Sequence, residues 1–168
     1  MSARGTRATE ELARAGIAHV VHAYEAPGRL GVARRERPAY GREAAAALGV
    51  NEVRIFKTLV ATVDGRLALA IVPVAGELDL KALAGALDGR RADIADPAEA
   101  ERATGYVIGG ISPLGSRRRL PTILDESAAD HETILVSAGR RGLQVELAPG
   151  ELVRATGAIV APIARLER

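Results

Sequence analysis

The sequence predicts a mixed α/β fold of the α+β type: one domain whose strongly curved, mainly antiparallel mixed sheet is barrel-like and flanked by helices. Segments with strand-like patterns outnumber the helical ones, and Asp64-Gly65 between two of them is a strong type I′ hairpin signal. Hairpin-linked strands pair antiparallel, and helices then cover the sheet. The length of 168 residues suits a single domain, 1–168, with a core that needs no cross-links.

Helices are predicted where a capping residue precedes an alanine-rich, amphipathic run and a glycine or proline follows it. Strands are predicted where apolar residues alternate with polar ones or form a short continuous run. The segment 27–38, rich in Gly and Arg, is predicted to be a mobile loop, and 104–115 a strand that leads into a glycine-rich loop. The predicted helices are 6–15, 41–48, 78–87, 96–103 and 149–155, and the other strands are 17–25, 53–63, 66–74, 121–125, 133–137, 143–147 and 158–164.

The strand 53–63 carries a lysine on its apolar face. Side chains alternate along a strand, so Lys57 shares a face with Val53, Leu59 and other apolar residues, while the opposite face is predicted to be more polar. Of 23 basic residues only Lys57 and Lys81 are lysines, so the compact ammonium is unusual here. Lys57 either extends its stem along the sheet to reach solvent or forms the floor of a pocket.

The composition narrows the possible chemistry. Without cysteine the chain has no disulfide, no thiolate nucleophile and no Cys-ligated metal, and three scattered histidines make a His-rich metal site unexpected. We therefore expect no metal and no other cofactor. The sequence contains no run of about 18 apolar residues and no apolar signal core at its start, so we expect a cytoplasmic protein without a membrane partner.

Arginines are clustered although the formal net charge is only +2. Clusters at 34–37, 117–119 and 140–141 fit either a polyanionic partner or a solvated Arg-rich surface. The triplet Arg117, Arg118 and Arg119 follows the glycine-rich loop closely, which suits contact with the phosphates of a nucleic-acid end at a pocket rim.

The glycine pair Gly109-Gly110 has two interpretations. Its backbone N–H groups would reach a substrate carbonyl or phosphate as oxyanion donors do, or the pair is a structural turn. The spacing matches neither a Walker A motif nor a dinucleotide fingerprint, because no suitable helix follows. Ser112 precedes Pro113 and lacks a Gly-x-Ser-x-Gly elbow, so a serine hydrolase is not expected.

Five segments in consistent order resemble the YbaK/EbsC family of free-standing aminoacyl-tRNA editing domains, which are related to the editing insertion of bacterial prolyl-tRNA synthetases. The resemblance runs from about Thr6 to Arg165 and is strongest to the Cys-tRNA(Pro)/Cys-tRNA(Cys) deacylase branch. The glycine-rich segment is its most specific element. The five segments are Phe56-Lys57-Thr58-Leu59, 73–79, 104–115, 120–123 and Arg141-Gly142-Leu143.

This resemblance implies hydrolysis of a mischarged aminoacyl-tRNA, with Lys57 as the essential lysine. It also implies that the tRNA acceptor end is the partner, rather than DNA, and that prolyl-tRNA synthetase joins in a ternary complex. The family's aspartate two residues after the late Arg-Gly is absent, and the residue at that place keeps hydrogen bonding but loses charge. The implied substrate-binding residues are Tyr24, Gly109, Gly110, Ser112 and Gln144, and the expected tRNA contacts are Arg117, Arg118, Arg119 and Arg140.

For a cysteinyl substrate the family mechanism is substrate-assisted: the substrate thiol attacks its own ester and forms a thiolactone. A chain without cysteine and without a Ser–His pair is consistent with that route, in which Lys57 holds the tRNA end or the scissile carbonyl, as a cation or as a neutral base. Two alternatives stay open. Gln144 leaves room for a deacylase of Ala-tRNA(Pro) or another mischarged tRNA, and the fold also suits a non-catalytic tRNA- or synthetase-binding module.

Overall fold

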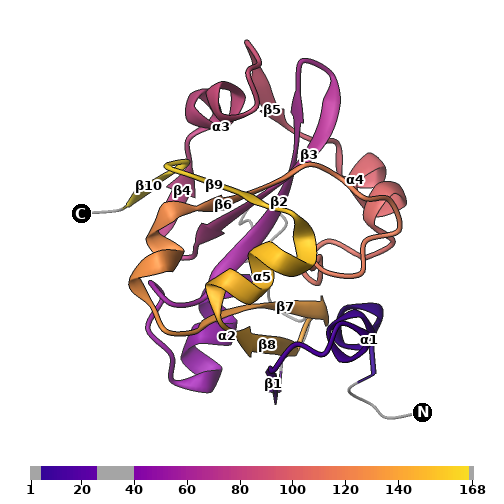
Figure 1. Cartoon of the computed structure of the whole chain (residues 1–168), viewed down its shortest axis with the longest axis vertical. Coiled ribbons are helices and arrows are strands. Elements are labelled where there is room, and N and C mark those ends of the chain that lie inside the picture. The colour runs from indigo at the N-terminus through magenta and orange to yellow at the C-terminus, as the bar shows by residue number, and fades with distance from the viewer. Residues whose placement is uncertain (1–4, 26–39, 167–168) are drawn as a thin grey trace, which may run out of the picture.

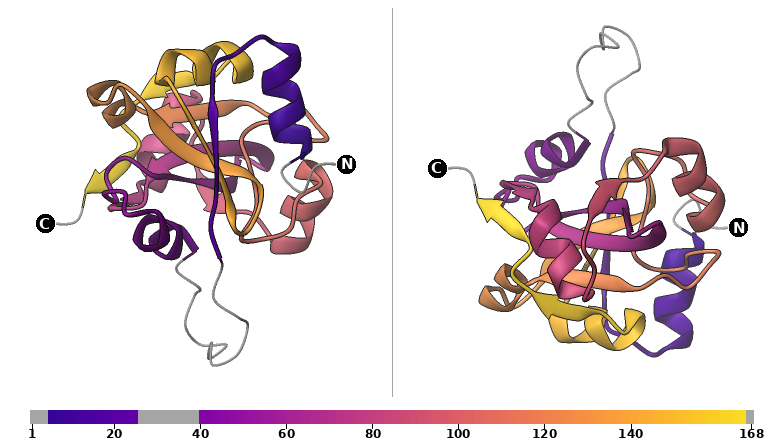
Figure 2. Two further views of the ribbon diagram at one scale, coloured as in Figure 1. Left: turned by 90° about the horizontal axis from the view of Figure 1, so that it is seen from below. Right: turned by 90° about the horizontal axis from the view of Figure 1, so that it is seen from above.

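The computed structural model describes residues 5–25 and 40–166 and has mixed α+β architecture (Figure 1). Figure 2 shows the helices distributed around the sheets, with α1 close to α5 and α2 on the opposite side of the molecule. The helices are α1 Arg7–Arg14, α2 Tyr40–Leu48, α3 Leu80–Ala86, α4 Pro97–Thr104 and α5 Pro149–Thr156, with the 3-10 helix η1 Glu126–Asp130. The strands are β1 Val20–Ala23, β2 Phe56–Val63, β3 Arg66–Pro73, β4 Gly76–Leu78, β5 Ala92–Ile94, β6 Thr122–Asp125, β7 Ile134–Arg140, β8 Leu143–Leu147, β9 Ile159–Ala161 and β10 Ala164–Leu166.

The strands form three sheets, in the orders β5-β2-β3-β6-β9, β1-β8-β7 and β10-β4. Among the pairs of described strands, β3-β6 and β6-β9 are parallel and the others antiparallel, which confirms the prediction of a mixed, mainly antiparallel arrangement. The two larger sheets meet at a bridge between Ile55 and Leu135, where the Leu135 N–H donates to the Arg54 carbonyl at 3.0 Å. The described strands do not close into a barrel. None of the described helices is both long and apolar enough to cross a membrane.

The β2–β3 hairpin is the longest pairing in the fold, from Phe56↔Pro73 to Val63↔Arg66. Asp64 and Gly65 both have positive φ, 50° and 82°, which confirms the type I′ turn. The predicted polar face of this strand is wrong: Phe56 and Val60, on the face opposite to Lys57, are 2% and 6% exposed. Because the chain packs against both sides of β2, neither face is left to solvent. The strand also begins at Phe56, so Val53 lies outside it.

Predicted helix starts are confirmed at three caps. The side chain of Thr6 accepts from the Thr9 N–H at 3.1 Å, Asp79 accepts from the Ala82 N–H at 3.1 Å, and Asp96 caps α4 in the same way. Each cap satisfies a backbone donor that the first helical turn leaves unpaired.

The strand predicted within 104–115 is wrong. Thr104 ends α4, and Gly105 follows it with φ of 79°, a left-handed cap that favours glycine. The chain then continues as turns, anchored by Tyr106, whose hydroxyl donates to the Leu114 carbonyl at 2.7 Å. Burial raises the pKa of this tyrosine. Val107 and Ile108 are exposed, so these apolar residues, which suggested a buried strand, lie on the surface.

The remaining differences concern short elements. The strands β4 and β5 and the helix η1 were not predicted, because three to five residues are too few to show a period. The strand predicted at 17–25 shortens to Val20–Ala23, and the one at 158–164 divides into β9 and β10, which belong to different sheets. The predicted loop 27–38 lies outside the described residues, as does the cluster 34–37.

Asp125 explains the division of the last strand. This carboxylate, 4% exposed, accepts from the backbone N–H groups of Ile163 and Ala164, both at 2.9 Å, through one oxygen. Its other oxygen accepts from the Ser127 hydroxyl at 2.6 Å and the Ser127 N–H at 3.1 Å. One side chain thus joins the end of β6 to the start of β10 and to η1.

We expect Asp125→Ala to lower the free energy of unfolding by about 2–4 kcal/mol, because buried N–H groups are left without acceptors. Urea denaturation measures the change. The control is Asp130→Ala, an exposed carboxylate on the same 3-10 helix, which we expect to stay within about 0.5 kcal/mol of the parent. Equal stability of the two variants would contradict the role assigned to Asp125.

Candidate functional site

The candidate site forms where β2 lacks a strand partner on one edge. On that edge β5 pairs only with Ala61–Val63, and the Ala95 N–H then donates to the Val60 carbonyl at 3.0 Å. At the other end, the Arg54 carbonyl accepts from Leu135. Successive residues of a strand point their backbone groups to opposite edges, so Thr58, like Arg54 and Val60, directs its N–H and C=O toward the open edge. No described strand pairs with Thr58 on that edge.

A cavity of about 620 Å³ lies along this open edge, in the size range of small-molecule sites. One end of it is polar and the other apolar. The end that holds the polar side chains is lined by Lys57, Thr58, Glu77, Ser137 and Gln144, with Arg42, Tyr24, Tyr40 and the apolar Ile55, Phe56 and Val74 beside them, and the apolar end by Leu59, Val60, Ile94, Ala95, Pro97, Ala100, Ile108 and Ile111.

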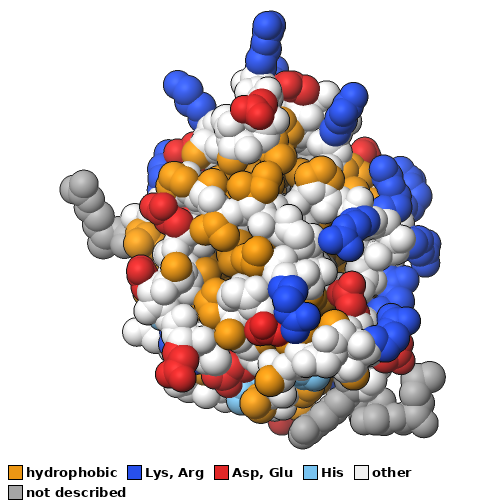
Figure 3. Space-filling model, in the orientation of Figure 1, with side chains coloured by type: hydrophobic (Ala, Val, Ile, Leu, Met, Phe, Trp, Pro, Cys, Tyr) orange, Lys and Arg blue, Asp and Glu red, His pale blue; other side chains and the backbone are white. Residues whose placement is uncertain are grey.

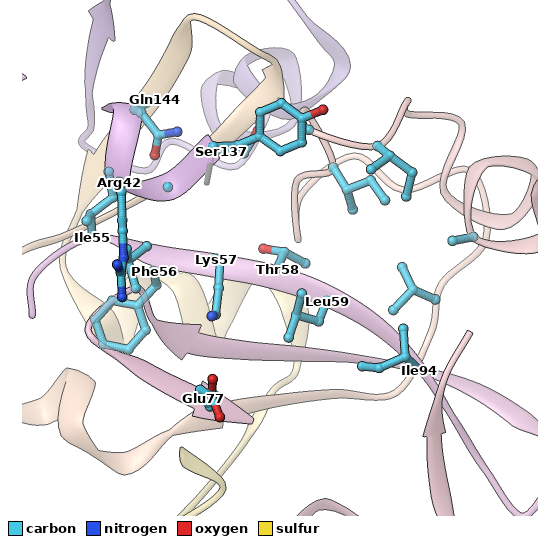
Figure 4. A pocket seen from close by; sticks show the side chains of 18 of the residues that line it. Arg42, Ile55, Phe56, Lys57, Thr58, Leu59, Glu77, Ile94, Ser137 and Gln144 are labelled. Atoms are coloured by element: carbon cyan, nitrogen blue, oxygen red, sulfur yellow. The ribbon is translucent and has the colours of Figure 1, made fainter. Parts of the chain in front are cut away.

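The polar end contains buried acceptors without partners. Gln144 is 7% exposed, and its Oε1 has no hydrogen-bond partner; the same is true of the Thr58 Oγ1. Figure 4 shows Lys57 pointing from β2 toward Glu77, on the side of the strand opposite to Gln144 and Ser137. Buried polar atoms in native structures are nearly always paired, so these two oxygens indicate a place for a ligand that donates hydrogen bonds.

Helix α2 and the β7–β8 turn hold the glycine-rich loop in place. Arg141 makes a bidentate ion pair with Glu43, with distances of 2.8 to 3.2 Å, and its guanidinium lies 5.0 Å from the Tyr40 ring centroid. The Tyr40 ring in turn packs on Gly109, where a Cβ would approach ring carbons at 3.0 to 3.2 Å. Gly109, at φ of 97°, thus lines the cavity against an aromatic ring.

Gly110 does not line the cavity, although it lies next to Gly109. A Cβ on it would lie 2.6 Å from the Arg140 Cα, so the glycine permits close packing of two backbones. Its N–H donates to the Val107 carbonyl at 2.9 Å, and its carbonyl accepts from the Ser137 hydroxyl at 3.1 Å. The Gly110 amide is therefore engaged in a turn and is not an oxyanion donor in this arrangement.

The other predicted site residues lie in different places. Tyr24, Lys57, Gly109 and Gln144 line the cavity together. Ser112 does not: it is fully buried, and its hydroxyl accepts from the Leu114 N–H at 3.2 Å.

The predicted arginines at the rim of this pocket are not found there. Arg117 and Arg119 line a second, smaller hollow of about 260 Å³ that shares no residue with the cavity, and Arg118 is exposed beside them. Arg140 is exposed as well, with its backbone against Gly110. The triplet lies close to the glycine-rich loop in the sequence. In the structure, however, the backbones of Arg117 and Arg118 bind to the C-terminal end of α4.

A charged network on β8 lies beside the polar end. Glu146, on the same face as Gln144 by strand alternation, accepts from Thr133, from His22 at 2.8 Å and from Arg54 at 3.0 Å. The hydrogen bond from Thr133, followed by those from His22 and Arg54, lowers the pKa of Glu146. This network fixes β1, β8 and the residues before β2 around the cavity.

Several lining residues were not singled out from the sequence. Thr58 follows Lys57 directly, and Ser137 is paired with Gln144 across the β7–β8 hairpin, so its place was readable from the hairpin register. The apolar end had no sequence signal, because its residues come from β2, β5, α4 and the glycine-rich loop. Within the described residues, no three His, Asp or Glu side chains gather in a way that would hold a metal ion.

Comparisons with known proteins agree with one another. The family model described as "Aminoacyl-tRNA editing domain" matches residues 38–155. A protein of Enterococcus faecalis named "Putative Cys-tRNA(Pro)/Cys-tRNA(Cys) deacylase EbsC" is 42% identical over 125 residues, which cover 73% of this chain and 76% of that protein.

Solved structures show the same fold over nearly the whole chain. One is described as "a putative trans-editing enzyme for prolyl tRNA synthetase", with a TM-score of 0.78, 27% identity and coverage of 98% of this chain and 99% of that one. Another, the hypothetical protein APE2540, has a TM-score of 0.80 at 25% identity and covers 95% and 100% of the two chains. The resemblance read from the sequence motifs is thus confirmed, and the chain belongs to the aminoacyl-tRNA editing domain family.

Proposed function

We propose that this protein hydrolyses mischarged aminoacyl-tRNA in the cavity along the open edge of β2, with Cys-tRNA(Pro) as its substrate. Membership of the editing family and the name of the Enterococcus faecalis relative support this reaction class. The observation that carries the proposal is the polar end of the cavity, which has a lysine on one side of β2 and two unpartnered buried oxygens, of Thr58 and Gln144, in the same lining. An aminoacyl ester brings an ammonium donor and a carbonyl to such a place.

The two ends of the cavity suit the two parts of the substrate. The α-ammonium group donates hydrogen bonds, which Gln144 and Thr58 accept, so the aminoacyl group lies at the polar end. The terminal adenosine then lies toward the apolar end, where Ile94 and Ile108 are about half exposed and offer flat apolar contact to a base. Ile94 pairs with Ala61, four residues along β2 from Lys57, or roughly 13 Å at the rise of a strand.

The ester needs positioning and charge stabilisation more than a protein nucleophile. The described lining contains no histidine, and the hydroxyl of Ser137 is already donated to the Gly110 carbonyl. In the reaction the substrate thiol attacks the ester carbonyl carbon: a C–S bond forms, the ester C–O bond breaks, and the thiol proton passes to the ribose oxygen that leaves with the tRNA. The product is a thiolactone, which water opens to cysteine.

The Thr58 N–H is the donor for the oxyanion that forms on the carbonyl. It points to the open edge, and the described chain supplies no acceptor for it. A fixed backbone donor stabilises developing negative charge without reorganisation, and one such donor contributes about 10²–10³-fold in rate. Lys57, on the adjacent strand position and the opposite face of β2, adds a positive charge close to the reacting end of the substrate.

Gln144 is also compatible with a second substrate, Ala-tRNA(Pro). Its carboxamide accepts the ammonium without adding charge, and nothing in its position depends on a thiol, so Ala-tRNA(Pro) remains the alternative substrate. Prolyl-tRNA synthetase is the proposed protein partner, since the structural relative is described as a trans-editing enzyme for that synthetase.

Substrate choice is tested with Cys-, Ala- and Ser-tRNA(Pro) incubated with the purified protein while ester loss is followed. We expect rapid loss of the cysteinyl ester alone, with a thiolactone as the first product. Preferential release of alanine would show that Ala-tRNA(Pro), and not Cys-tRNA(Pro), is the substrate. If no ester is cleaved but tRNA is still bound, the proposed reaction is wrong and the protein is a non-catalytic binding module.

For Lys57→Ala we expect kcat/KM to fall by about 100-fold or more, because a charge close to the reacting end is lost in a partly desolvated site. The chain offers a matched control, Lys81→Ala, which removes the other lysine from an exposed position on α3. Thermal unfolding of both variants checks that they remain folded. Full activity of Lys57→Ala would refute the role given to this lysine.

Replacing Thr58 separates its backbone donor from its hydroxyl. Proline is tolerated where a strand N–H faces an open edge, so Thr58→Pro keeps the pairing with β3 and removes the donor. We expect it to lower kcat by about 10²–10³-fold, and Thr58→Val, which keeps the N–H but loses the hydroxyl that accepts the ammonium, to lower kcat/KM by only about tenfold. Leu59→Pro, whose N–H points to β3, is expected to destabilise the fold. Similar activity for folded Thr58→Pro and Thr58→Val would exclude the N–H from catalysis.

A further inference from the structure

The hollow lined by Arg117 and Arg119 lies outside the cavity and has a different character. Its volume is about 260 Å³, and much of its wall is polar: Ser116, Thr122 and Thr156 line it together with the two arginines. Figure 3 shows Lys and Arg side chains gathered along the edge of the molecule beside α4 and the loop that follows it.

Fixed backbone contacts hold the arginines at this place. The N–H groups of Arg117 and Arg118 donate to the carbonyls of Thr104 and Ala103, at 2.9 and 3.0 Å, at the C-terminal end of α4. Gly157 makes room for Arg119, since a Cβ there would lie 3.1 Å from the Arg119 Nη2. The segment is therefore a rigid part of the fold.

The groups in the hollow are suited to an anion. The Ser116 Oγ is buried and has no hydrogen-bond partner, so it is ready to donate to a ligand. None of the ion pairs within the described chain involves Arg117, Arg118 or Arg119. Glu11 also lines the hollow, but one of its oxygens accepts from the Gly115 N–H at 2.7 Å, and the two guanidinium groups outweigh its single charge.

The position of α4 relates the hollow to the cavity. Pro97, at the start of the helix, lines the cavity, and Thr104, at its end, is held by the arginine segment. A helix of eight residues is about 12 Å long, which corresponds to roughly three to four nucleotides of a stacked strand at 3.4 Å each. A strand whose last nucleotide lies in the cavity therefore reaches the arginines near the end of the single-stranded segment of a tRNA.

We infer that the hollow formed by Ser116, Arg117 and Arg119 binds a backbone phosphate of the tRNA acceptor arm, with Arg118 contacting a neighbouring phosphate. The inference rests on the proposed tRNA substrate. Guanidinium groups bind phosphate oxygens bidentately, and such contacts position a nucleic acid without reading its sequence. The hollow thus sets how the acceptor arm enters the cavity, while the cavity selects the amino acid.

The test measures binding of uncharged tRNA(Pro) to the full chain by fluorescence anisotropy at several salt concentrations. Each phosphate contact contributes about 0.7–0.9 to the magnitude of the slope of log K against log salt, and Arg117 and Arg119 share one phosphate, so we expect Arg117→Ala/Arg119→Ala to reduce that magnitude by about 0.7–0.9. The charge-matched control is Arg66→Ala/Arg90→Ala, two exposed arginines near the β2–β3 turn. An unchanged slope, or an equal fall in the control, would overturn the inference.

Two further measurements make the result specific. Ser116→Ala removes no charge, so we expect weaker binding with the same salt slope; unchanged affinity would overturn the assignment of the hollow. Cysteinyl-adenosine is too short to reach the arginines, so the double arginine variant should hydrolyse it at the parent rate. If the parent protein cleaves no ester but the slope still falls, the proposed function fails and the phosphate site stands. If the parent protein cleaves esters but the slope does not change in the double arginine variant, the phosphate site is wrong and the proposed function stands.

Discussion

The gap in strand pairing along β2 is the constraint on which the site depends. At one end of this edge the β1-β8-β7 sheet approaches through the Ile55–Leu135 bridge, at the other end β5, from the same sheet as β2, pairs with β2, and neither continues to Thr58. Backbone groups in a folded protein require partners, so an unpaired strand edge inside a cavity is complete only with water or a ligand. In the proposed function, the substrate takes the place of the missing strand.

The glycine pair contributes to this site through packing. Gly109 packs against the Tyr40 ring, beside which Arg141 lies with its ion-pair partner Glu43, and Gly110 packs against the backbone of Arg140. A side chain at either place would separate the glycine-rich loop from the β7–β8 turn. These contacts explain why a glycine is needed at both places.

Local signals made much of the fold predictable. Capping by Thr6, Asp79 and Asp96 and the Asp64-Gly65 turn are determined by neighbouring residues, so the helices and the central hairpin were correct. Lys57 was found because a lysine breaks an apolar pattern, and the family resemblance supplied Tyr24, Gly109 and Gln144. What failed depends on contacts distant in sequence: the burial of Ser112, the position of the arginine triplet and the three-residue strands β4 and β5 follow from packing that no short window contains.

The direction in which Lys57 points explains why a neutral residue, Gln144, is suited to its position. A buried carboxylate is costly unless a cation pairs with it, and Gln144 lies on the side of β2 away from the lysine, which points toward Glu77 (Figure 4). An aspartate at 144 would have no lysine facing it in this arrangement, whereas a carboxamide stays buried at lower cost. The charged groups in the described lining are then Arg42, Lys57 and Glu77, a formal sum of +1 instead of zero. In the proposed function that excess suits the phosphates of a tRNA end, and the substrate ammonium is recognised by neutral oxygens, which accept hydrogen bonds from any amino acid. Selection among amino acids must therefore come from the side chain, through its size or through its own reactive thiol.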